Sequence, residues 1–240
     1  SDLRLVLGLF GLALPAGCVS PSSSLTPPNR VVAPYPAVLA VAPLSNESGV
    51  TIDPASRAEV SDDLVAAING VEGWDAVPLD RTLTAMAQLG LAEIRSEADA
   101  RRLMETIGVD GMLVGTITQW GPYDPPRFGA NVLLIGDRGR LQASLDPRAL
   151  SGRTGDAEPT GGTEEPVATV TDLVVDLDAV NHGTRARLRA YAESHYDVSG
   201  GFDPPERYYL MVFDRFLEFA AREVIGGLVD RERGRLLAGG

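Results

Sequence analysis

The chain has 240 residues, of which 44% are hydrophobic and 22% are charged, and its formal net charge is −12. This length supports one sizeable core or two small ones, and the negative charge argues against binding to nucleic acid, which needs a basic face. All 21 basic residues are arginine, which excludes a Walker A lysine and a Schiff-base lysine.

The N-terminal run 3–14 is apolar apart from Arg4 and precedes the only cysteine, Cys18. A membrane-spanning helix needs roughly 20 apolar residues, whereas the h-region of a signal peptide needs about 7–15. The segment resembles a bacterial lipoprotein signal, in which the cysteine is acylated and becomes the new N-terminus. We therefore expect residues 1–17 to be a signal peptide and Cys18 to carry lipid. A plain secretory signal and a buried structural cysteine are the alternatives.

Residues 18–36 are rich in proline and serine, which predicts a semi-extended tether between the lipid and a folded domain over 37–233. Residues 234–240 would form a tail. Val19 stands where an aspartate would retain a lipoprotein in the inner membrane of enteric bacteria. This favours the outer membrane, facing the periplasm.

The fully apolar run 37–42 predicts a central strand that is buried on both faces. Asp53 can cap the helix that follows, Pro54 suits its first turn, and the helix should end at Gly70. Residues 74–79 predict a second strand, placed at a sheet edge because Pro78 removes a hydrogen-bond donor.

Asp80 can cap a further helix that stops at Gly90, and Ser96 can cap a third helix that continues through Ile107. Residues 112–120 and 131–135 have the composition of strands. Residues 137–168 contain no periodic apolar pattern and predict a mobile loop.

From Thr171 onward apolar and acidic residues alternate, which predicts a half-buried strand whose outer face carries Asp172, Asp176 and Asp178. Asn181 or Thr184 can cap the next helix. A long helix over 206–233 ends the domain. Strands interleaved with helices predict an α/β fold, a single mixed sheet with helices packed on it.

The three aspartates near His182 are the strongest candidate for chemistry, because alternate carboxylates can bind a cation or serve as acid and base. A solvated outer face explains the same pattern more simply. No metal-ligand spacing and no paired nucleophile and base are present in the sequence. We therefore expect no catalytic residue, metal or cofactor, and keep a hydrolase or small-ligand site on this face as the alternative.

Aromatic residues concentrate near the C-terminus, at Tyr208, Tyr209, Phe213, Phe216 and Phe219. Their helical spacing predicts a core helix packed on the sheet. Because they occupy more than one helix face, we expect Tyr208 and Phe219 to be available to a protein partner.

Residues 38–49 (VLAVAPLSNESG), 77–81 (VPLDR) and 107–120 (IGVDGMLVGTITQW) resemble in their order a family of envelope lipoproteins. That family includes the curli-secretion lipoprotein CsgG and the penicillin-binding-protein activator LpoB, and the N-terminal domain of TolB has a related architecture. The resemblance implies an α/β domain without catalytic residues. It also implies a membrane-anchored scaffold or regulator that binds another envelope protein. A subunit of a homo-oligomeric envelope complex is a further alternative, whereas pore-forming insertions are not recognisable.

Overall fold

The structure is a computed structural model that describes residues 31–136, 168–195 and 202–238. Cys18, the predicted signal peptide, most of the predicted tether and the predicted loop up to residue 167 lie outside the described residues. Six strands and six helices follow one another in the described ranges. In chain order they are β1 Val32–Val41, β2 Ser45–Asn46, α1 Pro54–Asn69, β3 Glu72–Ala76, α2 Leu79–Leu89, α3 Glu97–Ile107, β4 Gly111–Gly121, β5 Arg127–Gly136, β6 Ala168–Asp178, α6 His182–His195, α7 Glu206–Met211 and α8 Phe213–Ala238.

The strands form one mixed sheet in the order β3-β1-β4-β5-β6, with the short β2 also paired to β4. β1 is parallel to both β3 and β4, whereas β4, β5 and β6 are mutually antiparallel neighbours. This confirms the predicted mixed α/β architecture with helices packed on one sheet. The edge position of β3 is also as predicted from Pro78, which follows it.

β1 lies between two strands, as its uninterrupted apolar run predicts. Leu39 and Val41 pack into the core on one face of the sheet, and Ala40 packs into the core on the other. The strand begins at Val32, earlier than the predicted residue 37, so the folded domain includes the end of the predicted tether.

The N-termini of α1, α2 and α3 follow the predicted capping chemistry in two of these three helices. The Asp53 side chain accepts a hydrogen bond from the Ser56 backbone, and the Ser96 side chain accepts one from the Asp99 backbone. α2 differs, because it begins at Leu79 after Pro78 and makes no side-chain cap. The prediction that Asp80 caps this helix is therefore wrong; Asp80 lies in the first turn, where its charge still favours the helix dipole.

The predicted single helix over 206–233 is two helices, and this prediction is corrected at Val212. Val212 has extended backbone angles of φ −113° and ψ 102°, a region that β-branched residues favour. The break turns α7 towards α6, where Tyr209 meets the Tyr191 ring edge-on at 5.3 Å. A straight helix would not bring Tyr209 and the aromatic residues of α8 into one core.

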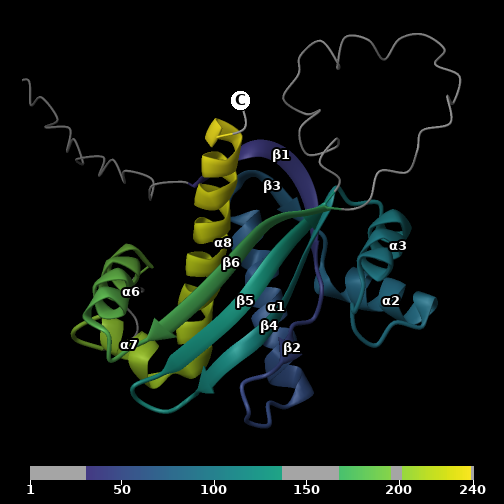
Figure 1. Cartoon of the computed structure of the whole chain (residues 1–240). Coiled ribbons are helices and arrows are strands. Elements are labelled where there is room, and N and C mark those ends of the chain that lie inside the picture. The colour runs from purple at the N-terminus through teal and green to yellow at the C-terminus, as the bar shows by residue number, and fades with distance from the viewer. Residues whose placement is uncertain (1–30, 137–167, 196–201, 239–240) are drawn as a thin grey trace, which may run out of the picture.

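The helices cover the two faces of the sheet unequally (Figure 1). α1 and α8 pack on one face together with the larger hydrophobic core, which reaches every strand from β3 to β6. α2 and α3 pack on the other face, and their smaller core involves mainly β1 and the start of β4. In Figure 1 the near face of β4, β5 and β6 carries no helix.

A buried carboxylate ties the C-terminal part of α8 to two strands of the sheet, β1 and β6. Glu232 is 0% exposed and accepts hydrogen bonds from Tyr35 of β1 at 2.8 Å, from Thr171 of β6 and from Arg235. Burial alone would raise the pKa of this carboxyl, but these hydrogen bonds and the Arg235 charge hold its pKa below the ordinary value. Burial and the neighbouring carboxylate raise the pKa of Tyr35. Glu232 is therefore charged, paired and structural.

Candidate docking face on the sheet

The side chains of β4, β5 and β6 that point away from α1 and α8 form the feature we call the open face. They are Val114, Thr116, Asn131, Leu133, Asp172, Val174 and Asp176. Alternation of side chains along each strand puts them opposite the buried residues Ile117, Val132 and Leu177. Two of them are large apolar residues left in solvent: Val174 is 65% exposed and Leu133 is 36% exposed.

Strand register arranges the open face in cross-strand rows. Val114, Leu133 and Asp172 form one row across β4, β5 and β6, and Thr116, Asn131 and Val174 form the next. Directly opposed residues in neighbouring antiparallel strands have Cβ atoms about 4.5–5.5 Å apart. The apolar and acidic side chains are thus neighbours on one rigid surface.

A hollow of about 530 Å³ lies over these rows. Its walls are Pro43 of the β1–β2 connection, Glu47 directly after β2, and Glu93 and Ile94 of the α2–α3 connection. Three carboxylates line it, those of Glu47, Glu93 and Asp172, and no arginine does. Arg95 pairs with Glu93 at 3.1 Å and Arg231 approaches Asp172 at 3.9 Å, both from outside the hollow. The hollow therefore has a floor of mixed apolar and polar side chains and a negative charge that no lining arginine offsets.

β6 lies beside this hollow and is the last strand of the sheet on that side. It pairs with β5 on one side, and none of the described strands pairs with its other side. α8 covers only its back face, where Gly227 lies so close that an added Cβ would stand 2.9 Å from Leu173. The outer edge of β6 therefore presents backbone groups that can pair with another strand.

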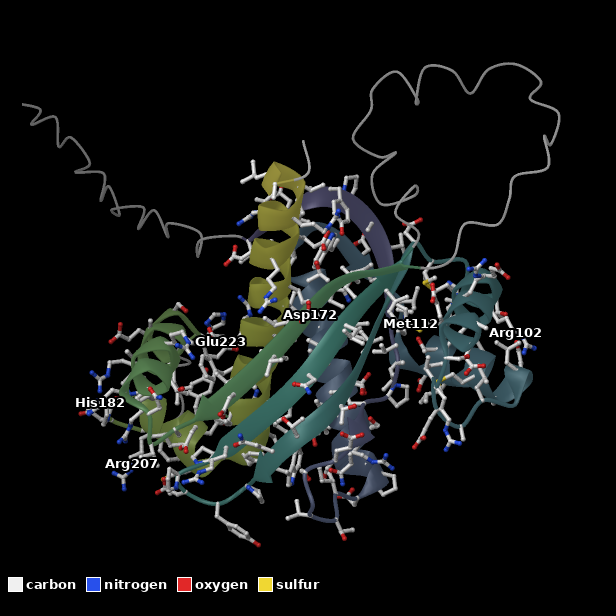
Figure 2. All side chains as sticks on the ribbon, viewed as in Figure 1. Arg102, Met112, Asp172, His182, Arg207 and Glu223 are labelled. Carbon is white, nitrogen blue, oxygen red and sulfur yellow. The ribbon has the colours of Figure 1, made fainter. Side chains whose placement is uncertain are left out.

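The predicted carboxylate site does not assemble as a catalytic cluster. Asp172 and Asp176 are exposed on the open face, whereas Asp178 is half-buried and pairs with Arg127 at 3.2 Å. His182 begins α6, at the far side of the molecule from Asp172 (Figure 2). Among the described residues no group of three or more His, Cys, Asp or Glu side chains could hold a metal ion.

The two predicted partner contacts have different surroundings. Phe219 is 1% exposed and packs between Tyr191 and Phe216, so its ring offers no surface to a partner. Tyr208 is half-buried on α7, and its hydroxyl accepts a hydrogen bond from Arg215 at 3.2 Å. The aromatic concentration is thus mainly core, as its helical spacing predicts.

An acidic cluster lies between α1 and α8, on the opposite side of the sheet from the open face. Burial, together with the nearby carboxylates of Glu218, Glu59 and Asp214, raises the pKa of Asp63 to about 7. One Asp63 oxygen, Oδ2, is buried without a hydrogen-bond partner among the described residues. The cluster is a point of pH sensitivity in the fold, with Arg222 at its rim.

Sequence reasoning missed the two exposed apolar residues of the open face. Val174 stands between Asp172 and Asp176 on the outer side of β6, where strict alternation would place a polar residue. That irregularity was a visible signal. Leu133 carried no such signal, because it lies in the continuously apolar run 132–135 of β5, whose exposed side depends on where the helices pack.

No protein-family model matches the chain, and no curated protein sequence matches it significantly. Solved structures that are similar to it at low identity include the three described next. The C-terminal domain of LpoB from Salmonella enterica is 14% identical, with 61% of this chain and 86% of that chain covered and a TM-score of 0.36. The hypothetical protein CT253 from Chlamydia trachomatis is 12% identical, with 81% and 98% covered and a TM-score of 0.42. Lipoprotein GNA1162 from Neisseria meningitidis is 17% identical, with 69% and 99% covered and a TM-score of 0.38.

The neighbours include an LpoB domain, which belongs to the group that residues 38–120 resemble. Such distant likenesses do not identify what this chain does, so its function has to be argued from its own residues. None of the helices in the described ranges is long and apolar enough to span a bilayer.

Proposed function

We propose that this chain is a lipoprotein of the bacterial envelope that binds another envelope protein through the open face. Lipid on Cys18 would hold it at the outer membrane, with the domain facing the periplasm. The domain would act as a scaffold or regulator without catalysis of its own. This proposal joins the lipoprotein-type signal in the sequence to the bare sheet face in the structure.

The observation that carries the proposal is the exposure of Val174 and Leu133 on a face that the fold leaves uncovered. Burying an apolar side chain contributes about 25 cal/mol per Å². Most other apolar side chains of this sheet are buried under helices, and the exceptions on β1 are Val32 and Val38. Adjacent apolar and acidic side chains on a rigid sheet are suited to a protein surface of complementary shape and charge.

Site-specific photo-crosslinking in cells tests this function. A photoreactive residue at Leu133 or Val174 should yield one defined crosslinked envelope protein. The same residue at Leu83 of α2 or Tyr123 of the β4–β5 turn, which are also exposed, should not. Equal crosslinking from all four positions, or none from the open face, would contradict the proposal.

The anchor is tested separately. Cells fed a clickable palmitate analogue should label the wild-type protein, and an exported Cys18→Ser variant should carry no label. Label that persists in the variant would contradict lipidation at Cys18, but it would not bear on binding through the open face.

A further inference from the structure

We propose that the partner binds by adding an extended strand to the outer edge of β6, with basic side chains on either side of an apolar one. This inference rests on the proposed function and specifies the chemistry of the partner at the same site. It follows from three features of β6: its free edge, its order of side chains on the open face, and the charges beside it.

The free edge determines the mode of binding. β6 spans Ala168–Asp178 and pairs with β5 from end to end, with one register shift between Thr169 and Thr171. The stretch that carries Asp172, Val174 and Asp176 lies beyond that shift and is held in continuous register. Its other side is unpaired among the described strands. An extended peptide can satisfy such an edge with main-chain hydrogen bonds, and its alternate side chains then lie on the open face.

The order of side chains determines the partner's chemistry. Asp172, Val174 and Asp176 alternate along β6 on the open face. A strand paired with β6 would place its own residues directly opposite these three, about 4.5–5.5 Å away between Cβ atoms. Arginine or lysine opposite each aspartate and a β-branched residue opposite Val174 would complement them. The required pattern is basic, any residue, apolar, any residue, basic.

The surroundings of the two aspartates favour a cationic partner. Asp176 lies beside Gly129 of β5, which contributes no side chain, and Asp172 lies beside Leu133. Arg231 of α8 reaches Asp172 only at 3.9 Å, across an exposed pair. Glu93 and Glu47 add further negative charge across the hollow.

The same charges disfavour a second copy of this chain as the occupant. Antiparallel pairing of two β6 strands about Val174 would place Asp172 of each copy opposite Asp176 of the other. Like charges directly opposed across a strand pair are destabilising, and charged edges protect sheets from self-association. The carboxylates thus select a basic strand against an identical one.

Two peptides added to the full chain test the inference. Acetyl-Gly-Arg-Thr-Val-Thr-Arg-Gly-amide has the required alternation, and its counterpart with glutamate in place of arginine reverses the charges. At low salt the arginine peptide should bind about tenfold more tightly than the glutamate peptide. The β6 amides should show the largest NMR shift changes and slower hydrogen exchange. An arginine peptide of the same composition with adjacent basic residues should bind more weakly.

Charge reversal in the protein supplies the matched comparison. The double variant Asp172→Arg/Asp176→Arg should prefer the glutamate peptide, and Asp172→Asn/Asp176→Asn should lose the preference while keeping the shape of the strand. Asp75→Arg/Glu105→Arg changes net charge equally at exposed positions away from β6 and should behave as wild type.

An unchanged preference in the Asp172/Asp176 variants would overturn the inference, as would self-association of the wild type through β6 in sedimentation experiments. If crosslinking from Leu133 still captured a partner in those cases, the proposed function would stand and only the strand-addition mode would fail. If both the crosslink and the peptide binding were absent, both would fail.

Discussion

The two faces of the antiparallel half of the sheet are made from the same three strands but have different surroundings. On the covered face, residues such as Val132 and Leu177 lie beneath α8 and join the larger core. On the open face, Leu133 and Val174 occupy the intervening positions and remain in solvent. Helices α2 and α3 stop short of β5 and β6, so half of one sheet face is left free for binding. We therefore propose that stability and recognition lie on opposite sides of the same strands.

Loss of a covered-face aromatic residue should have the largest effect on stability. Phe216 of α8 is 0% exposed and lies in the larger core. Phe216→Ala should lower the free energy of unfolding by about 3–5 kcal/mol, because it removes apolar contacts and leaves a cavity. Urea unfolding measures this. A loss below about 1 kcal/mol would contradict the view that this face carries the stability.

Glu232→Ala should cost about 3 kcal/mol, since the buried partners Tyr35, Thr171 and Arg235 would lose their shared acceptor. The pKa of Glu232 is lowered in the folded state, so its contribution is present above the unfolded-state pKa of 4.5 and is lost as pH falls through the folded value. The free energies of unfolding of the wild type and the variant, measured between pH 3 and 7, should therefore become similar at acidic pH. If the two curves of unfolding free energy against pH ran parallel, the charge of Glu232 would not be the source of its stabilising effect.

Asp63, on the covered side of the sheet, should make stability depend on pH in the opposite direction to Glu232. Its pKa rises from 3.8 to about 7 on folding, so wild-type stability should fall as pH rises through this window. Asp63→Asn removes the buried charge and should stabilise the protein at pH 8 by about 2 kcal/mol. The exposed neighbour Asp62→Asn is the control and should change little. A destabilised Asp63→Asn variant at pH 8 would contradict this assignment.

Val174→Thr on the open face should have the smallest effect on stability, within about 0.5 kcal/mol. Threonine has nearly the same shape and suits a strand, and this position buries little surface in the free protein. Crosslinking from Leu133 should nevertheless weaken in this variant, because the hydroxyl would be buried against the partner. A large loss of stability would mean that the open face belongs to the fold.

Much of the fold could be predicted from local chemistry. Residues 37–42 are apolar without interruption and, apart from the exposed Val38, are buried on the two faces of the sheet. Asp53 and Ser96 cap helices as their side chains suggest. The break at Val212 could not be predicted in this way. The aromatic spacing on both sides of Val212 is helical, and only the tertiary contacts of α7 with α6 explain why the chain bends there.

The candidate site was predictable only in part. Alternation in β6 correctly placed Asp172 and Asp176 on an outer face, but it could not reveal that no helix covers the strands beside them. His182 is close to Asp178 in sequence but begins α6, and Figure 2 shows it well apart from Asp172. Helix placement depends on long-range packing, and it is this packing that separates a solvated strand face from a binding surface.

Carboxyl footprinting of the full-length protein, in isolated envelopes and after purification, tests the central claim most directly. The reagent modifies exposed carboxylates, and mass spectrometry reads each site. Asp172 and Asp176 should be protected in envelopes and reactive in the purified protein, while the exposed Asp62 and Glu105 should react equally in both. Equal reactivity of Asp172 and Asp176 in the two preparations would contradict the claim that the open face is occupied by a partner.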